Sequence, residues 1–209
     1  RYVIDYVSAA INTIPATDGN YTGLYSNLYR TNLLLDRAQN FNDKAAIAVP
    51  MGEAYFFRAF LHFELVQMYG DVLLVTKPLD ISSPELYAAR TPRAEVIRQC
   101  VADLKAAADL LPEKESEAGR VNKYAALALL SRVALSEATW DKFNTNGPTA
   151  TSNTAVANEL LPIARDAAAE VINSGNYTIF YNSILGNESY RYMFILEDGV
   201  QCNPAGLTS

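Results

Sequence analysis

The sequence has few of the residues on which most catalytic and metal sites depend. Its 209 residues include one histidine, His62, and two cysteines, Cys100 and Cys202. It contains no glycine-rich phosphate loop, no serine nucleophile motif and no pair of histidines spaced to bind a metal. A lone histidine within a predicted helix is more often a packing residue than a general base, because a base needs partners within reach. We therefore expect no catalytic residue, no metal and no cofactor.

Basic residues and long apolar runs are also scarce. The chain has 17 Lys and Arg against 23 Asp and Glu, a net charge of −6, and no basic stripe that would neutralise the phosphates of a nucleic acid. No apolar run is long enough to cross a bilayer. Two cysteines do not make a disulfide framework. We expect Cys100 to be a small buried hydrophobe on the inward face of a helix, whereas Cys202 lies in a loop-like tail.

Helical periodicity is abundant. Half of the residues are apolar and only 10 are glycine, which favours helix. The spacing of apolar residues predicts helices at about 2–14, 22–39, 44–69, 92–112 and 122–143, and a last helix that closes at Ser174 and Gly175. We expect Thr91 to cap the fourth helix with Pro92 at its first position, and Asn122 to cap the fifth. Pro50 is expected to kink the third helix or to mark its true start.

The most informative segment is the aromatic-rich helix that precedes Gly70. Its wide apolar face requires packing on more than one side, and Gly70 supplies the left-handed residue that closes a helix. Two ionic side chains, Glu53 and Arg58, lie among the apolar residues. An unpaired buried charge is costly, so we expect each to bond a helix end or the other. Asp103 is a candidate partner for Arg58, and Arg120 a similar structural anchor.

This segment resembles the signature helix of the SusD/RagB family, which reads Gly-Glu-Ala, aromatics, Arg-Ala and then Tyr-Gly-Asp-Val. Further blocks of the family pattern follow in order across residues 21–180, namely Arg90-Thr91-Pro92, the stretch from Gly119 to Ala126, and Ser174-Gly175-Asn176-Tyr177. Leu73 stands where the family usually has proline.

The resemblance implies a non-catalytic, surface-exposed lipoprotein of a Bacteroidetes glycan-uptake system. Such proteins sit on a TonB-dependent, SusC-like transporter in the outer membrane and hand it an oligosaccharide. They are held to the membrane by a lipid anchor, which we expect to be absent from this chain. Family members are more than twice as long, so the resemblance implies a fragment. Residues 1–188 would form the helical domain, and 189–209 would begin a second, loop-rich lobe.

The implied fold is all-α, an α-α superhelix of tetratricopeptide-like (TPR-like) helical hairpins with long irregular loops. The sequence also carries the spacing of the second helix of such a repeat, in which small and bulky residues alternate at offsets of four and three. Cys100, Leu104, Ala107 and Pro112 match that spacing. Small residues at these positions permit the close approach of neighbouring helices.

Tyrosine is the residue type that points to a ligand. The chain has 13 tyrosines. Aromatic rings stack on the C–H faces of sugars while tyrosine hydroxyls bond the sugar rim, which suits glycan binding. Tyr21 and Tyr25 follow the predicted turn that ends at Asn20, and we take these three residues as the candidate ligand-binding residues.

Two other functions remain open from the residues alone. An all-helical carbohydrate-active enzyme, either a glycoside hydrolase or a lyase, would need an acid and a base across a cleft. Carboxylates are plentiful, but nothing in the sequence selects a pair. A TPR-type adaptor would bind peptides in a concave groove lined by polar residues, whereas the predicted inner faces carry mostly alanines and aromatics.

Overall fold

The computed structural model describes residues 18–144, 154–181 and 183–192, and in these ranges the regular structure is helical. The longer helices are α2 (Gly19–Gln39), α3 (Ala48–Tyr69), α4 (Arg93–Leu110), α5 (Lys123–Phe143) and α6 (Thr154–Asn173). Three short helices are η1 (Pro84–Tyr87), η2 (Gly186–Glu188) and α7 (Ser189–Tyr192). The described ranges contain no strand, only an isolated bridge between Val72 and Thr91. The all-α prediction is confirmed, and the helix predicted at 2–14 lies outside the described residues.

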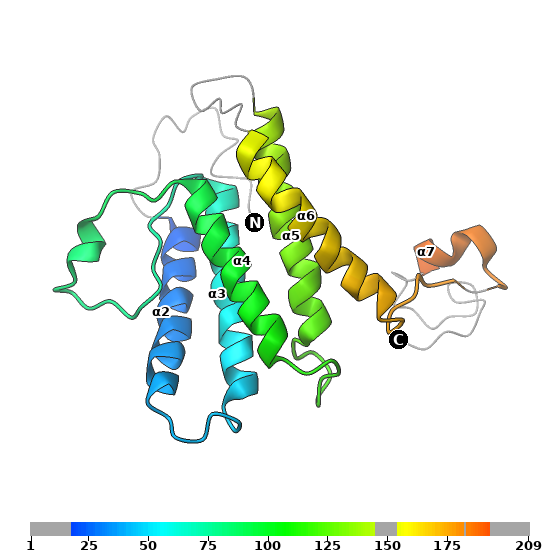
Figure 1. Cartoon of the computed structure of the whole chain (residues 1–209), viewed down its shortest axis with the longest axis horizontal. Helices are drawn as coiled ribbons and strands as arrows, with labels where there is room; N and C mark the ends of the chain where they lie inside the picture. Colours follow the sequence, from blue (N-terminus) through cyan, green and yellow to red (C-terminus); the bar gives the residue numbers. More distant parts are fainter. Residues whose placement is uncertain (1–17, 145–153, 182, 193–209) are drawn as a thin grey trace. The chain divides into compact units, whose positions relative to one another are not determined.

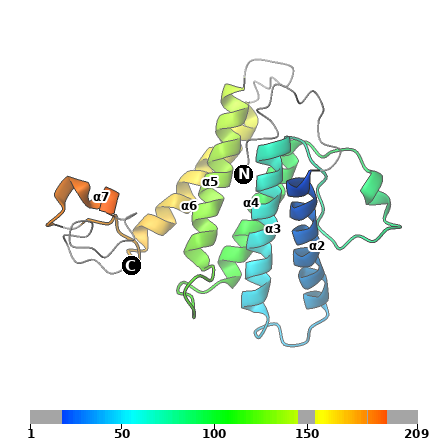
Figure 2. The ribbon, with the colours of Figure 1, turned by 180° about the vertical axis from the view of Figure 1, so that it is seen from behind.

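Contacts divide the chain into two units, residues 1–170 and 171–209. In the first unit, α2, α3, α4 and α5 lie side by side in sequence order, and each runs opposite to the helix before it (Figures 1 and 2). The second unit contains the last residues of α6 together with η2 and α7, where the Ser189 hydroxyl donates to the Gly186 carbonyl at 2.6 Å. The predicted boundary between 188 and 189 stays a prediction, as does the TPR character of the hairpins.

The core of the first unit centres on α3 and α4. Cys100, Leu104 and Ala107 of α4 are fully buried, as the spacing of small and bulky residues predicts. Gly52 of α3 lies against the end of α4, where an added Cβ would come within 2.8 Å of the Leu111 Cγ atom. A glycine at this position therefore sets how closely the two helices approach.

The start of α5 agrees with the prediction, whereas the start of α4 does not. Asn122 caps α5 as expected, with its side-chain oxygen accepting from the Ala125 amide at 2.8 Å. The prediction that Thr91 caps α4 is wrong: the helix begins at Arg93 and Pro92 occupies the capping position. The Asp71 carboxylate accepts from the Arg93 amide at 2.9 Å and so satisfies the helix end from outside. Thr91 instead pairs with Val72, its amide donating to the Val72 carbonyl at 2.8 Å.

The ends of α3 also refine the predictions. The helix begins at Ala48 rather than near 44, so Pro50 lies in the first turn, where a missing N–H costs little. Gly70 follows the last residue with φ 71° and ψ −120°. Its φ is positive as expected, but this ψ lies outside the left-handed helical region. Only glycine occupies such a backbone conformation without strain.

Candidate functional site

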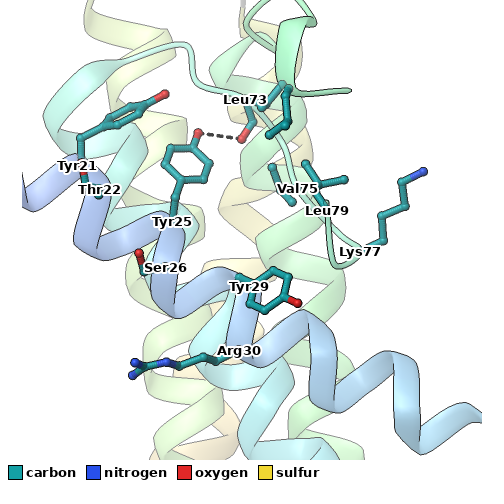
Figure 3. Close-up of a pocket in the computed structure, with 11 residues that line it drawn as sticks. Tyr21, Thr22, Tyr25, Ser26, Tyr29, Arg30, Leu73, Val75, Lys77 and Leu79 are labelled. Atoms are coloured by element: carbon teal, nitrogen blue, oxygen red, sulfur yellow. Dashed lines mark hydrogen bonds between the residues drawn. The ribbon is translucent and has the colours of Figure 1, made fainter. Parts of the chain in front are cut away.

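The candidate site is a groove between one face of α2 and the irregular segment that follows α3, residues 70–83, together with η1 (Figure 3). Its volume is about 650 Å³. The α2 face contributes tyrosines, hydroxyls and one arginine, and the irregular segment contributes aliphatic side chains and one lysine. The lining residues are Tyr21, Thr22, Tyr25, Ser26, Tyr29, Arg30, Leu73, Val75, Lys77, Leu79 and Leu86.

Three tyrosines form a stripe along α2. Tyr21, Tyr25 and Tyr29 follow one another at intervals of four residues, which places successive Cα atoms about 6 Å apart along the helix axis and their side chains on one face. The Tyr21 and Tyr25 ring centroids are 4.8 Å apart. Tyr69 of α3 packs edge-on against Tyr21 at 5.2 Å. Tyr21 and Tyr29 remain 40% and 46% exposed, so their rings are accessible from the groove.

Tyr25 fixes the stripe to the opposite wall. Its hydroxyl donates to the Leu73 carbonyl at 2.8 Å, a contact drawn in Figure 3. Burial raises the pKa of Tyr25 well above its ordinary value, and the hydroxyl of Tyr21 adds to that effect. The Tyr25 hydroxyl therefore stays protonated at every physiological pH and keeps this bond.

The start of α2 decides which predicted residues reach the groove. Asp18 caps the helix and accepts from the Asn20 amide at 2.9 Å, so α2 begins at Gly19, three residues earlier than predicted. The Tyr69 hydroxyl also donates to the Asp18 carboxylate, which lowers the pKa of Asp18. Asn20 is therefore a helical residue, and it lines a separate hollow of about 430 Å³ with Gly23 and Met68. Tyr21 and Tyr25 share the groove, whereas Asn20 does not.

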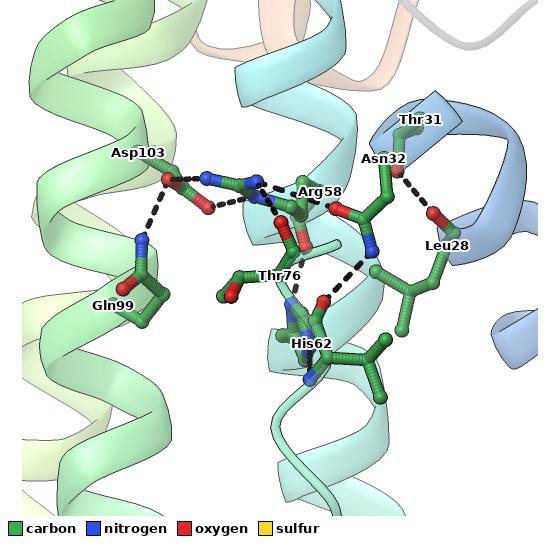
Figure 4. A network of polar contacts seen from close by, with 9 residues as sticks. Leu28, Thr31, Asn32, Arg58, His62, Thr76, Gln99 and Asp103 are labelled. Atoms are coloured by element: carbon green, nitrogen blue, oxygen red, sulfur yellow. Dashed lines mark hydrogen bonds and ion pairs between the residues drawn. The ribbon is translucent and has the colours of Figure 1, made fainter. Parts of the chain in front are cut away.

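Buried polar side chains hold the wall that faces α2 (Figure 4). The Asn32 amide donates to the Val75 carbonyl at 2.9 Å. Arg58 donates to the Thr76 carbonyl at 3.2 Å. The Val75 amide donates to Nε2 of His62 at 3.3 Å. Asn32 and His62 are almost completely buried, so these bonds tie an irregular segment into the helical core.

Arg58 is the centre of this network. Its guanidinium makes a two-pronged ion pair with Asp103, at 2.7 Å from Nε and 2.6 Å from Nη2. It also donates to the side-chain oxygen of Asn32 at 3.2 Å, and Gln99 donates to Asp103 at 2.9 Å. Arg58 thereby links α2, α3, α4 and the irregular segment at one point.

His62 has a packing role in this network. Because Nε2 accepts from Val75, the proton lies on Nδ1, which donates to the Arg58 carbonyl at 3.0 Å. Burial lowers the pKa of His62 to about 4. The ring is therefore neutral at physiological pH and has both nitrogens engaged.

Glu53 of α3 does not pair with Arg58. It accepts from Arg120 at 2.8 and 2.9 Å, across the loop that leads into α5. Arg120 thus ties the loop before α5 to α3 through its ion pair with Glu53. None of Glu53, Arg58, Gly70, Asp103 and Arg120 lines the groove.

Comparison with known proteins identifies the family. A family model described as "Starch-binding associating with outer membrane" matches residues 2–135, which is more than half of the chain. The chain belongs to the SusD-like family.

Similar proteins agree with this assignment. Two curated relatives from Formosa agariphila, SusD-like proteins P2 and P25, are 29% identical over 101 residues and 28% identical over 124 residues. These matches cover 48% and 56% of this chain. A solved SusD-like protein from Bacteroides fragilis is 25% identical, with a TM-score of 0.65 over 83% of this chain. A SusD-like carbohydrate-binding protein from the same species is also 25% identical, with a TM-score of 0.61 over 78% of this chain.

The match spans only part of each relative. This SusD-like chain covers 20% and 23% of the two curated proteins, and 30% and 28% of the two solved structures. In the ranges that the structure describes, no helix is long and apolar enough to cross a membrane. The same ranges contain no group of three or more His, Cys, Asp or Glu placed to hold a metal ion.

Several groove residues of the SusD-like chain were missed by sequence reasoning. Tyr29 continues the spacing of Tyr21 and Tyr25 by one more helical turn, and that repeat would have been enough to find it. Leu73, Val75 and Lys77 carry no comparable signal, because they reach the groove only through the path of an irregular segment.

Proposed function

We propose that this SusD-like chain provides a non-catalytic glycan-binding groove to a cell-surface nutrient-binding protein. The protein captures oligosaccharides and delivers them to a TonB-dependent, SusC-like transporter in the outer membrane, where a lipid anchor holds it. The observation that carries the proposal is the stripe of Tyr21, Tyr25 and Tyr29 along one wall of the groove.

The chemistry of the groove suits a sugar chain. The exposed rings of Tyr21 and Tyr29 can each receive the C–H face of a sugar, and hydroxyls of Thr22 and Ser26 lie on the same lining. Tyr25 is fixed by its bond to Leu73, and Tyr21 packs against Tyr69. Rings that are already held in place lose little conformational freedom on binding, which favours affinity.

The relatives support the same function. The family description names starch binding and the outer membrane, and one of the similar solved structures is a carbohydrate-binding protein. No carboxylate lines the groove, so the acid and base pair that glycoside hydrolysis requires is absent from its described lining. This observation favours capture over the enzymatic alternative.

A calorimetric screen of the 209-residue chain against oligosaccharides of different linkage and charge tests the proposal. Release of new reducing ends is followed in parallel. We expect saturable heat with one class of glycan and no new reducing ends. Replacing Tyr29 with alanine should weaken that binding about three- to tenfold, because it removes one stacking face. Tyr181→Ala is the matched control, since Tyr181 is also exposed and lies outside the groove.

Three results would overturn the proposal. New reducing ends would show an enzyme. Saturable binding whose affinity is the same in Tyr29→Ala as in the wild type would place the sugar outside the groove. If no oligosaccharide of the panel gives saturable heat, the chain does not bind glycans as proposed, and a panel of peptides would then test the adaptor function.

A further inference from the structure

We propose that the groove selects oligosaccharides that carry negative charge, either carboxylate or sulfate groups. The inference rests on the proposed glycan-binding function and adds the chemical class of the ligand. Its starting point is the charge of the lining. The chain has more acidic than basic residues, 23 against 17, yet the groove is lined by two cations, Arg30 and Lys77, and by no acid.

The two cations come from opposite walls. Arg30 lies on α2 and Lys77 on the irregular segment, and Tyr29 lies between their side chains in the view of Figure 3. Both side chains extend outward from Tyr29 in that view, so the two cations lie at opposite rims of the groove. The backbone of Lys77 is held in place, because its carbonyl accepts from the buried Asn32 amide at 3.4 Å.

Arg30 differs from the arginines that stabilise the fold. Arg58, Arg93 and Arg120 each form an ion pair with a carboxylate, at 2.6 to 2.8 Å. Within the described residues, the contact of the Arg30 guanidinium is a single long bond to the Asn27 side chain, at 3.5 Å. A guanidinium with most of its donors unused can bind a carboxylate or a sulfate in a two-pronged arrangement.

Lys77 already holds an anion that a ligand could replace. Its ammonium group lies 2.5 Å from the Glu85 carboxylate, and the two side chains are 61% and 40% exposed. Ion pairs this exposed contribute little to stability, so exchanging Glu85 for a ligand anion costs little. Glu85 is thus an internal competitor for the Lys77 ammonium group.

Matched glycans and charge variants test this inference on the 209-residue chain. One arm compares oligogalacturonate with the same oligomer after reduction of its carboxyl groups. A second arm compares a sulfated oligosaccharide with its desulfated form, and the two arms together show which anion is preferred. The variants are Arg30→Gln, Lys77→Gln and Glu85→Gln. The control is Arg37→Gln, on the same helix but outside the groove.

We expect the charged member of at least one pair to bind more tightly. Arg30→Gln and Lys77→Gln should each weaken that binding about two- to fivefold, as the loss of an exposed charge pair does, and weaken binding of the neutral member less. Glu85→Gln should strengthen it, because Lys77 loses its competitor. The preference should shrink as salt rises from about 0.01 M to about 1 M, since the Debye length falls from about 30 Å to about 3 Å.

The results that contradict the inference are separate from those that contradict glycan binding. Equal affinity for both members of each pair, or an equal loss with Arg37→Gln, would overturn the charge preference and leave the proposed function intact. No binding of any member, charged or neutral, would overturn both.

Discussion

Arg58 and Asp103 form a buried ion pair in the first unit, while two other buried carboxylates, Glu137 and Asp141, lie on α5. The arginine is 7% exposed, and Asp103 is 2% exposed. Replacing such a pair as a whole with apolar residues is often neutral in energy, but removing one partner leaves an uncompensated buried charge. Asn32 and Thr76 supply further oxygens to the same guanidinium, so the site is satisfied only when every member is present.

Asp103→Asn should therefore be strongly destabilising. The asparagine keeps the shape of the side chain but leaves the buried guanidinium without its counter-charge, which should lower the free energy of unfolding by about 3–5 kcal/mol. Urea unfolding measures the loss. The control is Arg98→Gln, which breaks the exposed pair between Arg98 and Glu159 and should cost no more than about 1 kcal/mol. Similar losses in both variants would contradict the central role of Arg58.

Single residues were predictable where the energetic demand was strong. A buried arginine must have an anionic partner, and that demand led from Arg58 to Asp103 on the facing helix. The partner of Glu53 was not predictable in the same way, because Arg120 lies 67 positions away and is brought near by a loop. Of the three candidate ligand-binding residues, Tyr21 and Tyr25 line the groove, whereas Asn20 faces another surface because Asp18 starts α2 early, and their role in binding stays a prediction.

Among the elements, the irregular segment after α3 has the largest effect on the site. Its path sets one wall of the groove, and no periodic pattern in its sequence encodes that path. Side chains of Tyr25, Asn32, Arg58 and His62 hold its backbone at Leu73, Val75 and Thr76. The helices themselves were predictable from apolar spacing. Their ends were less so, because Asp71 satisfies the start of α4 from outside the helix.

The anchor at His62 should make stability depend on pH. The pKa of His62 is about 4 in the folded chain and about 6.5 when unfolded, so the unfolded chain binds more protons between these values. The contribution is present in full above about pH 6.5 and is lost as pH falls toward 4, amounting to about 3 kcal/mol. Protonation would also remove the acceptor for the Val75 amide.

Urea unfolding between pH 7 and pH 4, about the interval over which the two pKa values differ, measures this effect. His62→Gln keeps a donor and an acceptor but does not titrate, so its unfolding free energy should fall less steeply with acid than that of the wild type. Carboxylates titrate in both proteins, and the difference between the two curves isolates the histidine. Parallel curves would contradict the assignment.

In the molecule as a whole, the candidate site lies within one of the two units. Every residue that lines the groove falls between Tyr21 and Leu86, inside the first of the two units. The groove is thus built from α2, the irregular segment and η1 alone. This SusD-like chain can therefore be tested directly for glycan binding, even though it spans less than a third of the relatives from Formosa agariphila and Bacteroides fragilis described above.

Hydrogen exchange of the 209-residue chain, with and without the oligosaccharide that gives the largest heat in calorimetry, tests the central claim most directly. Bound sugar should slow amide exchange in peptides that cover 19–30 and 71–87, and leave peptides of α5 and α6 unchanged. Exchange that slows only in α5, in α6 or beyond residue 171 would contradict the assignment of the groove as the glycan site.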